Sequence, residues 1–253
     1  MLHKRVHGGL YSSSFDLLDR EITQCFLHAE GPGALPARRT TKNLHGILSP
    51  SGPSRTVGQI SAWAYKEMAE AAFPDVFVVI GKGEKEGFFT YLFSGWETPF
   101  GLVHTAKEEG QELIALFPSL RNDALAFASS DAIASQLPFL QFANRDKLSE
   151  IVVLPLLINT LDYPACLLLG EALGDLGEQH ALCIIGSSNL YGDAVDHAVV
   201  EGLKSIDVKK IHDVTHVNKS AGDLLVFAEA MKSLFVKQGK LLHYTPGHAA
   251  MVF

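Results

Sequence analysis

Two glycine-containing segments of the chain carry side chains that could do chemistry. Residues 81–85 read Gly-Lys-Gly-Glu-Lys, which places a cation among small residues as phosphate-binding loops do. The GxxxxGK[ST] spacing is absent, and Glu86 stands where a GxGxxG loop would have its last glycine. A turn at the end of a strand is the preferred interpretation, with phosphate binding as the alternative.

The second segment, residues 186–189, reads Gly-Ser-Ser-Asn and could present a serine nucleophile at a turn from strand to helix. Leu190 occupies the place of the second glycine of a GxSxG elbow. His197 and His212 follow, but no aspartate and histidine come in an obvious catalytic-triad order. Small residues of an ordinary turn explain the segment equally well.

The eleven histidines are scattered, and His212 and His216 have the i, i+4 spacing of paired metal ligands. Val214 and Thr215 disfavour a helix between them, so the preferred interpretation is a loop with two exposed imidazoles. Asp123 and Asp131 have no carboxylate nearby in the sequence that would mark an acid–base pair.

Composition excludes several classes of protein. The net charge of −7 and the absence of a basic stripe argue against nucleic-acid binding. No apolar run approaches the ~20 residues that span a bilayer, and no apolar run follows the basic N-terminus as in a signal peptide. Three cysteines without CxxC spacing argue against a disulfide framework and a thiolate zinc site. We expect a soluble cytoplasmic protein.

The elements that position these residues alternate between strand and helix. Short apolar segments predict buried strands at residues 44–48, 76–80, 151–158 and 182–185. Amphipathic spacing predicts helices at residues 14–27, 57–72, 107–116, 194–205 and 221–236, with a loop at about 30–42. The pattern predicts one layered α/β domain over residues 1–253, with a central mixed or mostly parallel sheet flanked by helices.

In such folds ligands bind at the carboxyl ends of the strands. The loops that follow predicted strands are residues 49–53, 81–84 and 186–189. They are therefore expected to meet at one edge of the sheet.

Eight segments, in order along nearly the whole chain, resemble the Memo family, whose fold is similar to that of class III extradiol dioxygenases. Residues 7–11 resemble the family's AGxWY/F segment, and residues 47–53 its strand followed by PHAG. The other matches are residues 58–65 with a glycine and AxAY, 77–84 with a strand and GPSH, 96–101 with TPLG, 137–141 with LPFLQ, 153–157 with xxPxLV, and 186–189 with the start of SSDxSH.

The departures from the family's pattern fall on its polar positions. Ser51 stands for the histidine of PHAG and Glu84 for that of GPSH, while Asn189 and Gly192 replace the aspartate and histidine of SSDxSH. The acids and histidine of the family's EHSxE segment become Ser130, Asp131 and Ala134, and His216 aligns with a late cysteine of the family. The resemblance thus implies a metal site that has lost most of its ligands.

Two functions remain open. The first is a non-catalytic binding or scaffolding protein, for a protein or small-molecule ligand that is unknown. The second is a metal-dependent or hydrolytic enzyme with a rebuilt pocket, in which Glu84 or His216 acts as general base. Iron-type dioxygenase chemistry ranks behind both because its usual ligands are replaced. The predicted cleft residues are Ser51, Glu84, Asp131, Ser188, Asn189 and His216.

No cofactor is expected, and the alternative is a divalent iron, copper or zinc ion held by Glu84 and His216, with Asp131 as a third ligand. A solvated loop carboxylate beside Lys82 and Lys85 is the simpler interpretation of Glu84. A homo-oligomer is compatible with the sequence, and no membrane or nucleic-acid partner is expected.

Overall fold

A computed structural model of the protein describes residues 9–128, 130–215 and 221–253. The strands are β1 (Gly46–Ser49), β2 (Val76–Lys82), β3 (Gly87–Thr90), β4 (Trp96–Thr98), β5 (Gly101–Thr105), β6 (Leu120–Asn122), β7 (Val152–Asn159), β8 (Leu182–Ser187), β9 (Lys240–Thr245) and β10 (His248–Val252). The helices are α1 (Phe15–Leu27), α2 (Ser54–Glu70), α3 (Lys107–Leu116), α4 (Leu137–Ala143), α5 (Tyr163–Gly177), α6 (Val195–Ser205), α7 (Val208–Thr215) and α8 (Gly222–Ser233), with short 3-10 turns at Ala126–Ala128 and Leu148–Glu150.

The strands form one mixed sheet in the order β4-β5-β7-β2-β8-β1-β10-β9. From β5 to β1 every neighbouring pair is parallel, whereas β4, β10 and β9 pair antiparallel at the two sides. Strand β3 pairs antiparallel with the later half of β7 and carries β6 beside it. The predicted α/β fold with a mixed, mostly parallel sheet is therefore confirmed.

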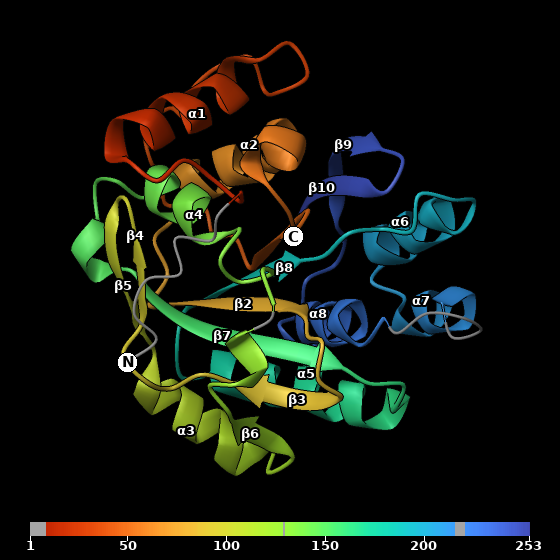
Figure 1. The fold of residues 1–253 in the computed structure, drawn as a ribbon. Coiled ribbons are helices and arrows are strands. Elements are labelled where there is room, and N and C mark those ends of the chain that lie inside the picture. The colour runs from red at the N-terminus through yellow and green to blue at the C-terminus, as the bar shows by residue number, and fades with distance from the viewer. Residues whose placement is uncertain (1–8, 129, 216–220) are drawn as a thin grey trace.

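Helices cover both faces of this sheet (Figure 1). Helices α1, α2 and α4 lie on one face, and α3, α5 and α8 lie on the other. The continuous apolar run of β2 follows from this arrangement, because alternate residues enter two different cores. Val78 and Ile80 pack toward α5 and α8, whereas Phe77 and Val79 pack toward α1, α2 and α4.

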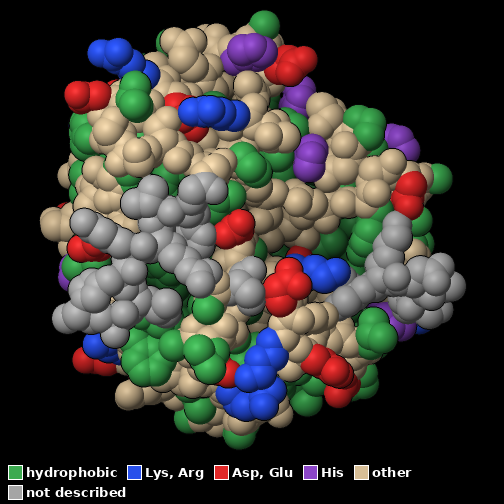
Figure 2. Space-filling view, in the orientation of Figure 1, with side chains coloured by type: hydrophobic (Ala, Val, Ile, Leu, Met, Phe, Trp, Pro, Cys, Tyr) green, Lys and Arg blue, Asp and Glu red, His purple; other side chains and the backbone are tan. Residues whose placement is uncertain are grey.

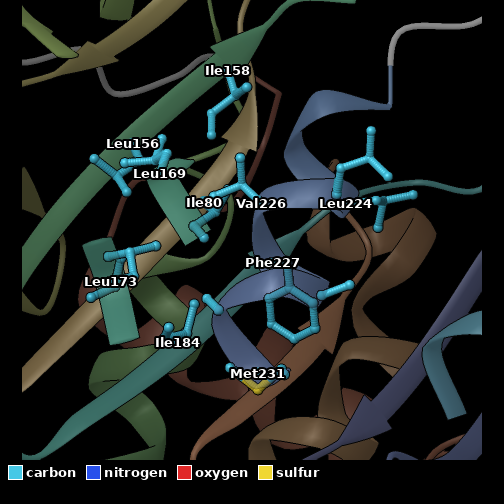
Figure 3. Close-up of a cluster of buried hydrophobic side chains, with 14 of the residues drawn as sticks. Ile80, Leu156, Ile158, Leu169, Leu173, Ile184, Leu224, Val226, Phe227 and Met231 are labelled. Atoms are coloured by element: carbon cyan, nitrogen blue, oxygen red, sulfur yellow. The ribbon is translucent and has the colours of Figure 1, made fainter. Parts of the chain in front are cut away.

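The core between the sheet and helices α5 and α8 is built from aliphatic side chains of both layers (Figure 3). Strand residues Ile80, Leu156, Ile158 and Ile184 face Leu169 and Leu173 of α5 and Leu224, Val226, Phe227 and Met231 of α8. All of these side chains are almost fully buried. This core fixes the positions of the strand ends from which the cleft loops emerge.

All five predicted helices and all four predicted strands are present, with ends shifted by a few residues. Helix α5 was not predicted, because its alanines, leucines and glycines leave little polar contrast between its faces. Helix α7 corrects the interpretation of His212 as a loop residue. His212 lies in the last turn of α7, with its ring stacked on that of Tyr163 at 4.1 Å between centroids.

Helices α5 and α8 approach each other closely because α5 presents glycines to α8. A Cβ atom added at Gly170 would lie 2.5 Å from Cβ of Glu229, and one at Gly174 would lie 2.4 Å from Cβ of Ser233. These distances are too short for real carbon contacts, so the helices could not pack this way with larger residues.

We expect Gly170→Ala to lower the free energy of unfolding by about 1–3 kcal/mol, since the added methyl group overpacks a rigid interface. Urea denaturation followed by circular dichroism measures the change. Leu168→Ala, at an exposed position on the same helix, is the matched control and should change stability far less. Equal losses in the two variants would contradict the packing argument.

Candidate ligand-binding cleft

The carboxyl ends of β1, β2 and β8 meet at a cavity of about 400 Å³. The space-filling view shows an acidic and a basic side chain next to each other over the end of β2 (Figure 2). The residues that line the cavity are Ser51, Lys82, Glu84, Ser130, Asp131, Ala132, Ser187, Ser188, Asn189, Leu190, Tyr191, Asp223 and Leu224. We call this cavity the cleft.

Five of the six predicted cleft residues line this one cavity: Ser51, Glu84, Asp131, Ser188 and Asn189. The sixth, His216, lies outside the described residues. Parallel pairing explains the convergence, because it places the loops after β1, β2 and β8 at the same edge.

Ser51 and Asn189 join the loops after β1 and β8 by two hydrogen bonds. The backbone N–H of Ser51 donates to Oδ1 of Asn189 at 3.0 Å, and Nδ2 of Asn189 donates to the Ser51 carbonyl at 2.8 Å. The Asn189 side chain thereby acts as a clasp between two chain segments. An aspartate could accept the first bond but could not donate the second.

Beneath this clasp, Gln136 connects three more parts of the cleft. Its Nε2 donates to the Pro50 carbonyl at 2.9 Å and to Oγ of Ser187 at 3.0 Å, and the Tyr65 hydroxyl donates to its Oε1 at 3.0 Å. Ser187 in turn donates to the Ala132 carbonyl at 2.6 Å. Buried polar groups are thus paired with one another, which makes the floor of the cleft rigid.

Asp223 lies at the start of α8 and is 4% exposed. Oγ of Ser188 donates to its Oδ2 at 2.7 Å. Burial raises the pKa of Asp223 above its ordinary value, and the hydrogen bond from Ser188 and the charge of Lys82 oppose that rise only in part. The cleft therefore contains a carboxyl group biased toward its protonated form.

Sequence reasoning missed Asp223, and it considered Lys82 only as part of a turn or, alternatively, of a phosphate-binding loop. Asp223 follows Gly222 at the first turn of a predicted helix, where an acidic residue is usually interpreted as a response to the helix dipole. Its position near β2 and β8 arises only from the packing of α8 on the sheet. No local pattern in the sequence carries that information.

Side chains from two other segments hold the loop from Lys82 to Glu84 by donating to its backbone carbonyl groups. Ser130 Oγ donates to the Lys82 carbonyl at 3.0 Å, and Nδ2 of Asn159 donates to the Glu84 carbonyl at 3.0 Å. Lys85 pairs with Asp123 at 2.6 Å, which directs it toward that side chain. Burial and then the charge of Asp131 raise the pKa of Tyr11, a residue of the core, to about 12.

Comparison with known proteins places the chain in a family. Residues 3–251 match the family described as Memo-like protein. The chain belongs to the Memo-like protein family. It is 26% identical to a MEMO1 family protein of Methanopyrus kandleri, over 98% of this chain and 97% of that one. It is also 26% identical to a MEMO1 family protein of Methanocaldococcus jannaschii, over 94% and 90%.

A MEMO1 family protein of Thermotoga neapolitana is 34% identical over 58% of this chain and 55% of its own length. Among solved structures, an uncharacterized protein of Escherichia coli K12 superposes with a TM-score of 0.56 at 13% identity, covering 83% of this chain and 99% of that one. At this identity the likeness concerns the fold alone. The family match and the MEMO1 relatives confirm the resemblance to the Memo family that the sequence indicates.

Among the described residues, the cleft of this Memo-like protein does not provide the ligands of the family's metal site. No group of three or more histidine, cysteine, aspartate or glutamate side chains within residues 9–128, 130–215 and 221–253 is placed to hold a metal ion. Serine and a neutral asparagine are weak metal ligands compared with imidazole and carboxylate, and here the Asn189 amide is engaged with Ser51.

A buried carboxylate next to the cleft fixes the position of the outer wall of the cleft. Asp196, at 0% exposure, accepts hydrogen bonds from the backbone N–H groups of Tyr191 at 2.7 Å, Gly192 at 3.1 Å and Gly247 at 2.8 Å, and from the Tyr244 hydroxyl at 3.2 Å. Tyr191 lines the cleft, whereas Tyr244 lies in β9 and Gly247 lies in the turn between β9 and β10. Asp196 thus ties the β9–β10 hairpin to the cleft.

We expect the Asp223→Asn variant to gain stability relative to the wild type as pH rises. A raised pKa means that the folded state binds more protons than the unfolded state between the ordinary value of 3.8 and the folded pKa, so wild-type stability falls as pH rises through that window. Asparagine does not titrate and can still accept the Ser188 hydrogen bond. Urea denaturation at pH values from 4 to 8 measures the difference.

Asp146→Asn is the control with the opposite sign. The Arg39 guanidinium lowers the pKa of Asp146, so this carboxylate stabilises the fold above the ordinary pKa and that contribution is lost on acidification. The Asp146 variant should therefore lose stability relative to the wild type as pH rises. If the Asp223→Asn variant also lost stability relative to the wild type as pH rises, burial could not be the dominant influence on the pKa of Asp223.

We expect Asp196→Asn to lower the free energy of unfolding by about 2–4 kcal/mol, because an amide has one acceptor oxygen and its NH₂ group would face buried N–H donors. Thermal and urea unfolding measure the loss. Glu201→Gln, an exposed change on the same helix, should alter stability little. A loss from Asp196→Asn no larger than that of the control would show that these hydrogen bonds contribute little.

Proposed function

We propose that this Memo-like protein is a non-catalytic binding protein whose cleft holds a small polar ligand. The observation that carries the proposal is the clasp between Ser51 and Asn189. It occupies the positions at which the family's pattern has a histidine and an aspartate. At the aspartate position, the side chain of Asn189 holds two walls of the cavity together by binding the backbone of Ser51.

The size and chemistry of the cleft support a small-molecule ligand. A cavity of about 400 Å³ lies within the range of about 300–1,000 Å³ that is usual for such sites. The wall offers the hydroxyl groups of Ser51 and Ser188, the charges of Lys82 and Glu84, and the ring of Tyr191. These groups suit a ligand with several hydrogen-bonding groups around a compact body.

The proposal also covers the domain organisation of the protein and its location in the cell. We infer that residues 1–253 act as one domain, since the sheet joins strands from β1 to β10 along the chain. Within the described residues no helix is long and apolar enough to cross a membrane, and the three cysteines are buried and free. We place the protein in the cytoplasm on the same grounds of composition as before.

A second candidate function is supported by Ser188 and Asp223. A carboxyl group whose pKa is raised by burial, 2.7 Å from a serine hydroxyl, is the geometry of a nucleophile with a general base. The same geometry also serves as a plain buried hydrogen bond. The two functions differ in whether a ligand leaves the cleft changed.

A screen of small polar metabolites by differential scanning fluorimetry, followed by calorimetric titration of the hits, tests the proposal. We expect a saturable ligand whose affinity falls about tenfold or more in Asn189→Ala, since the variant loses two hydrogen bonds that shape the cavity. Gln238→Ala, an exposed amide-to-methyl change outside the cleft, should bind as the wild type does.

Turnover of a hit would overturn the non-catalytic proposal. If turnover is lost in both Ser188→Ala and Asp223→Asn, the second candidate replaces the first. Iron, copper or zinc bound in stoichiometric amount by the purified protein, together with metal-dependent turnover, would contradict both.

A further inference from the structure

Most neutral polar groups of the cleft are already used for hydrogen bonds within the protein. The hydroxyl groups of Ser130, Ser187 and Ser188 donate to other groups of the protein at distances between 2.6 and 3.0 Å. The side-chain amide of Asn189 is bound to the backbone of Ser51 through both its oxygen and its nitrogen. A ligand would have to compete with these internal bonds, so its recognition depends on the other groups of the wall.

Two charged side chains of the wall, Lys82 and Glu84, are not engaged in this way. Among the residues that the structure describes, neither side chain forms an ion pair or a hydrogen bond. Lys85 on the same loop pairs with Asp123 at 2.6 Å, and its ammonium group lies 4.9 Å from the ring centroid of Phe89. Lys85 is therefore engaged elsewhere, and two opposite charges line the cleft without a counterion from the described part of the chain.

The backbone between these two charges is held in place by β7. Gly83 donates its N–H to the Ile158 carbonyl at 3.1 Å, and a Cβ atom added at Gly83 would lie 3.3 Å from Cβ of Leu157. Gly83 thus faces β7, whereas Lys82 and Glu84 on either side of it both line the cleft. Two residues of extended chain span about 6–7 Å, so the two side chains leave a fixed backbone about that far apart.

The charges of the wall disfavour a ligand that carries charge of one sign only. The acidic residues of the wall are Glu84, Asp131 and Asp223, and a plain anion would lie close to them. A plain cation would instead be repelled by the ammonium group of Lys82. The charge of Lys82 lowers the pKa of Asp223 less than burial raises it, so the buried carboxyl group is biased toward its neutral form and does not fully compensate that charge.

We propose that the ligand of the cleft is a small zwitterion of the amino-acid class. Its carboxylate contacts the Lys82 ammonium group, and its own ammonium group contacts the Glu84 carboxylate, so both charges of the wall gain a partner. Leu190 and Leu224 offer apolar surface for the rest of the molecule in a cavity of about 400 Å³. This inference rests on the binding function proposed for the cleft and adds the chemical class of the ligand.

Binding of free amino acids and of derivatives that lack one charge tests the proposal. Saturation-transfer NMR examines the standard L-amino acids one at a time with the full chain, and calorimetric titration gives the affinity of those that bind. The amino acid with the highest affinity is compared with its amide, which lacks the carboxylate, and with its N-acetyl derivative, which lacks the ammonium group. We expect each derivative to bind about tenfold or more weakly, since each loses one charge-assisted contact.

Two variants assign each charge of the ligand to a side chain. Lys82→Gln should bind the amino acid and its amide with similar affinity and keep the preference over the N-acetyl derivative. Glu84→Gln should show the reverse pattern. Lys85→Gln and Glu86→Gln change a charge on the same loop outside the wall of the cleft, so these controls should keep both preferences. All four side chains are exposed, and thermal unfolding should change little in any of the variants.

The outcomes separate this inference from the function proposed for the cleft. Binding of a neutral or singly charged metabolite, with no amino acid bound, would overturn the zwitterion and leave the binding function in place. Equal affinity for an amino acid and its two derivatives would overturn it as well, as would an unchanged preference for the amino acid over its amide in Lys82→Gln. Failure of every metabolite to bind would contradict both proposals.

Discussion

Parallel pairing of five neighbouring strands is the constraint on which the rest of this structure depends. Because β5, β7, β2, β8 and β1 all run the same way, every loop that leaves one of these strands emerges at a common edge. Residues separated by more than a hundred positions, such as Ser51 and Asn189, are brought within hydrogen-bonding distance by this pairing alone. The helices on both faces then supply the apolar cover that parallel strands require.

The opposite edge follows from the same constraint. Each parallel strand must be reached by a connection that returns across a face, so the helices that make those connections end where the next strand begins. Helix α5 therefore ends beside the start of β8, and the contacts of its glycines with successive residues of α8 show that the two helices run parallel. One sheet thus has a polar cleft at one edge and a pair of helix C-termini at the other.

The sequence was sufficient to predict the sheet class, the main helices and the loops that form the cleft, because apolar runs and amphipathic spacing are local properties. It was insufficient for α5, whose small and aliphatic residues are apolar on all sides, and for the short strands β9 and β10. It also did not reveal Asp223 or Asp196 as partners of cleft residues. Both act across long separations, from α8 to Ser188 and from α6 to the β9–β10 turn, and such contacts depend on how helices pack on the sheet.

The hydrogen bonds of Asp196 have a consequence for the motions of the protein. Leu190 donates its N–H to the Gly247 carbonyl at 2.8 Å, next to the bonds that Asp196 accepts from Tyr191 and Gly247. The cleft loop and the hairpin turn are therefore joined by the same group of hydrogen bonds. Neither segment can open without breaking hydrogen bonds of the other. Amide protons in the two segments should exchange with solvent through the same opening event, as one cooperative unit within a sheet whose central strands open much more rarely.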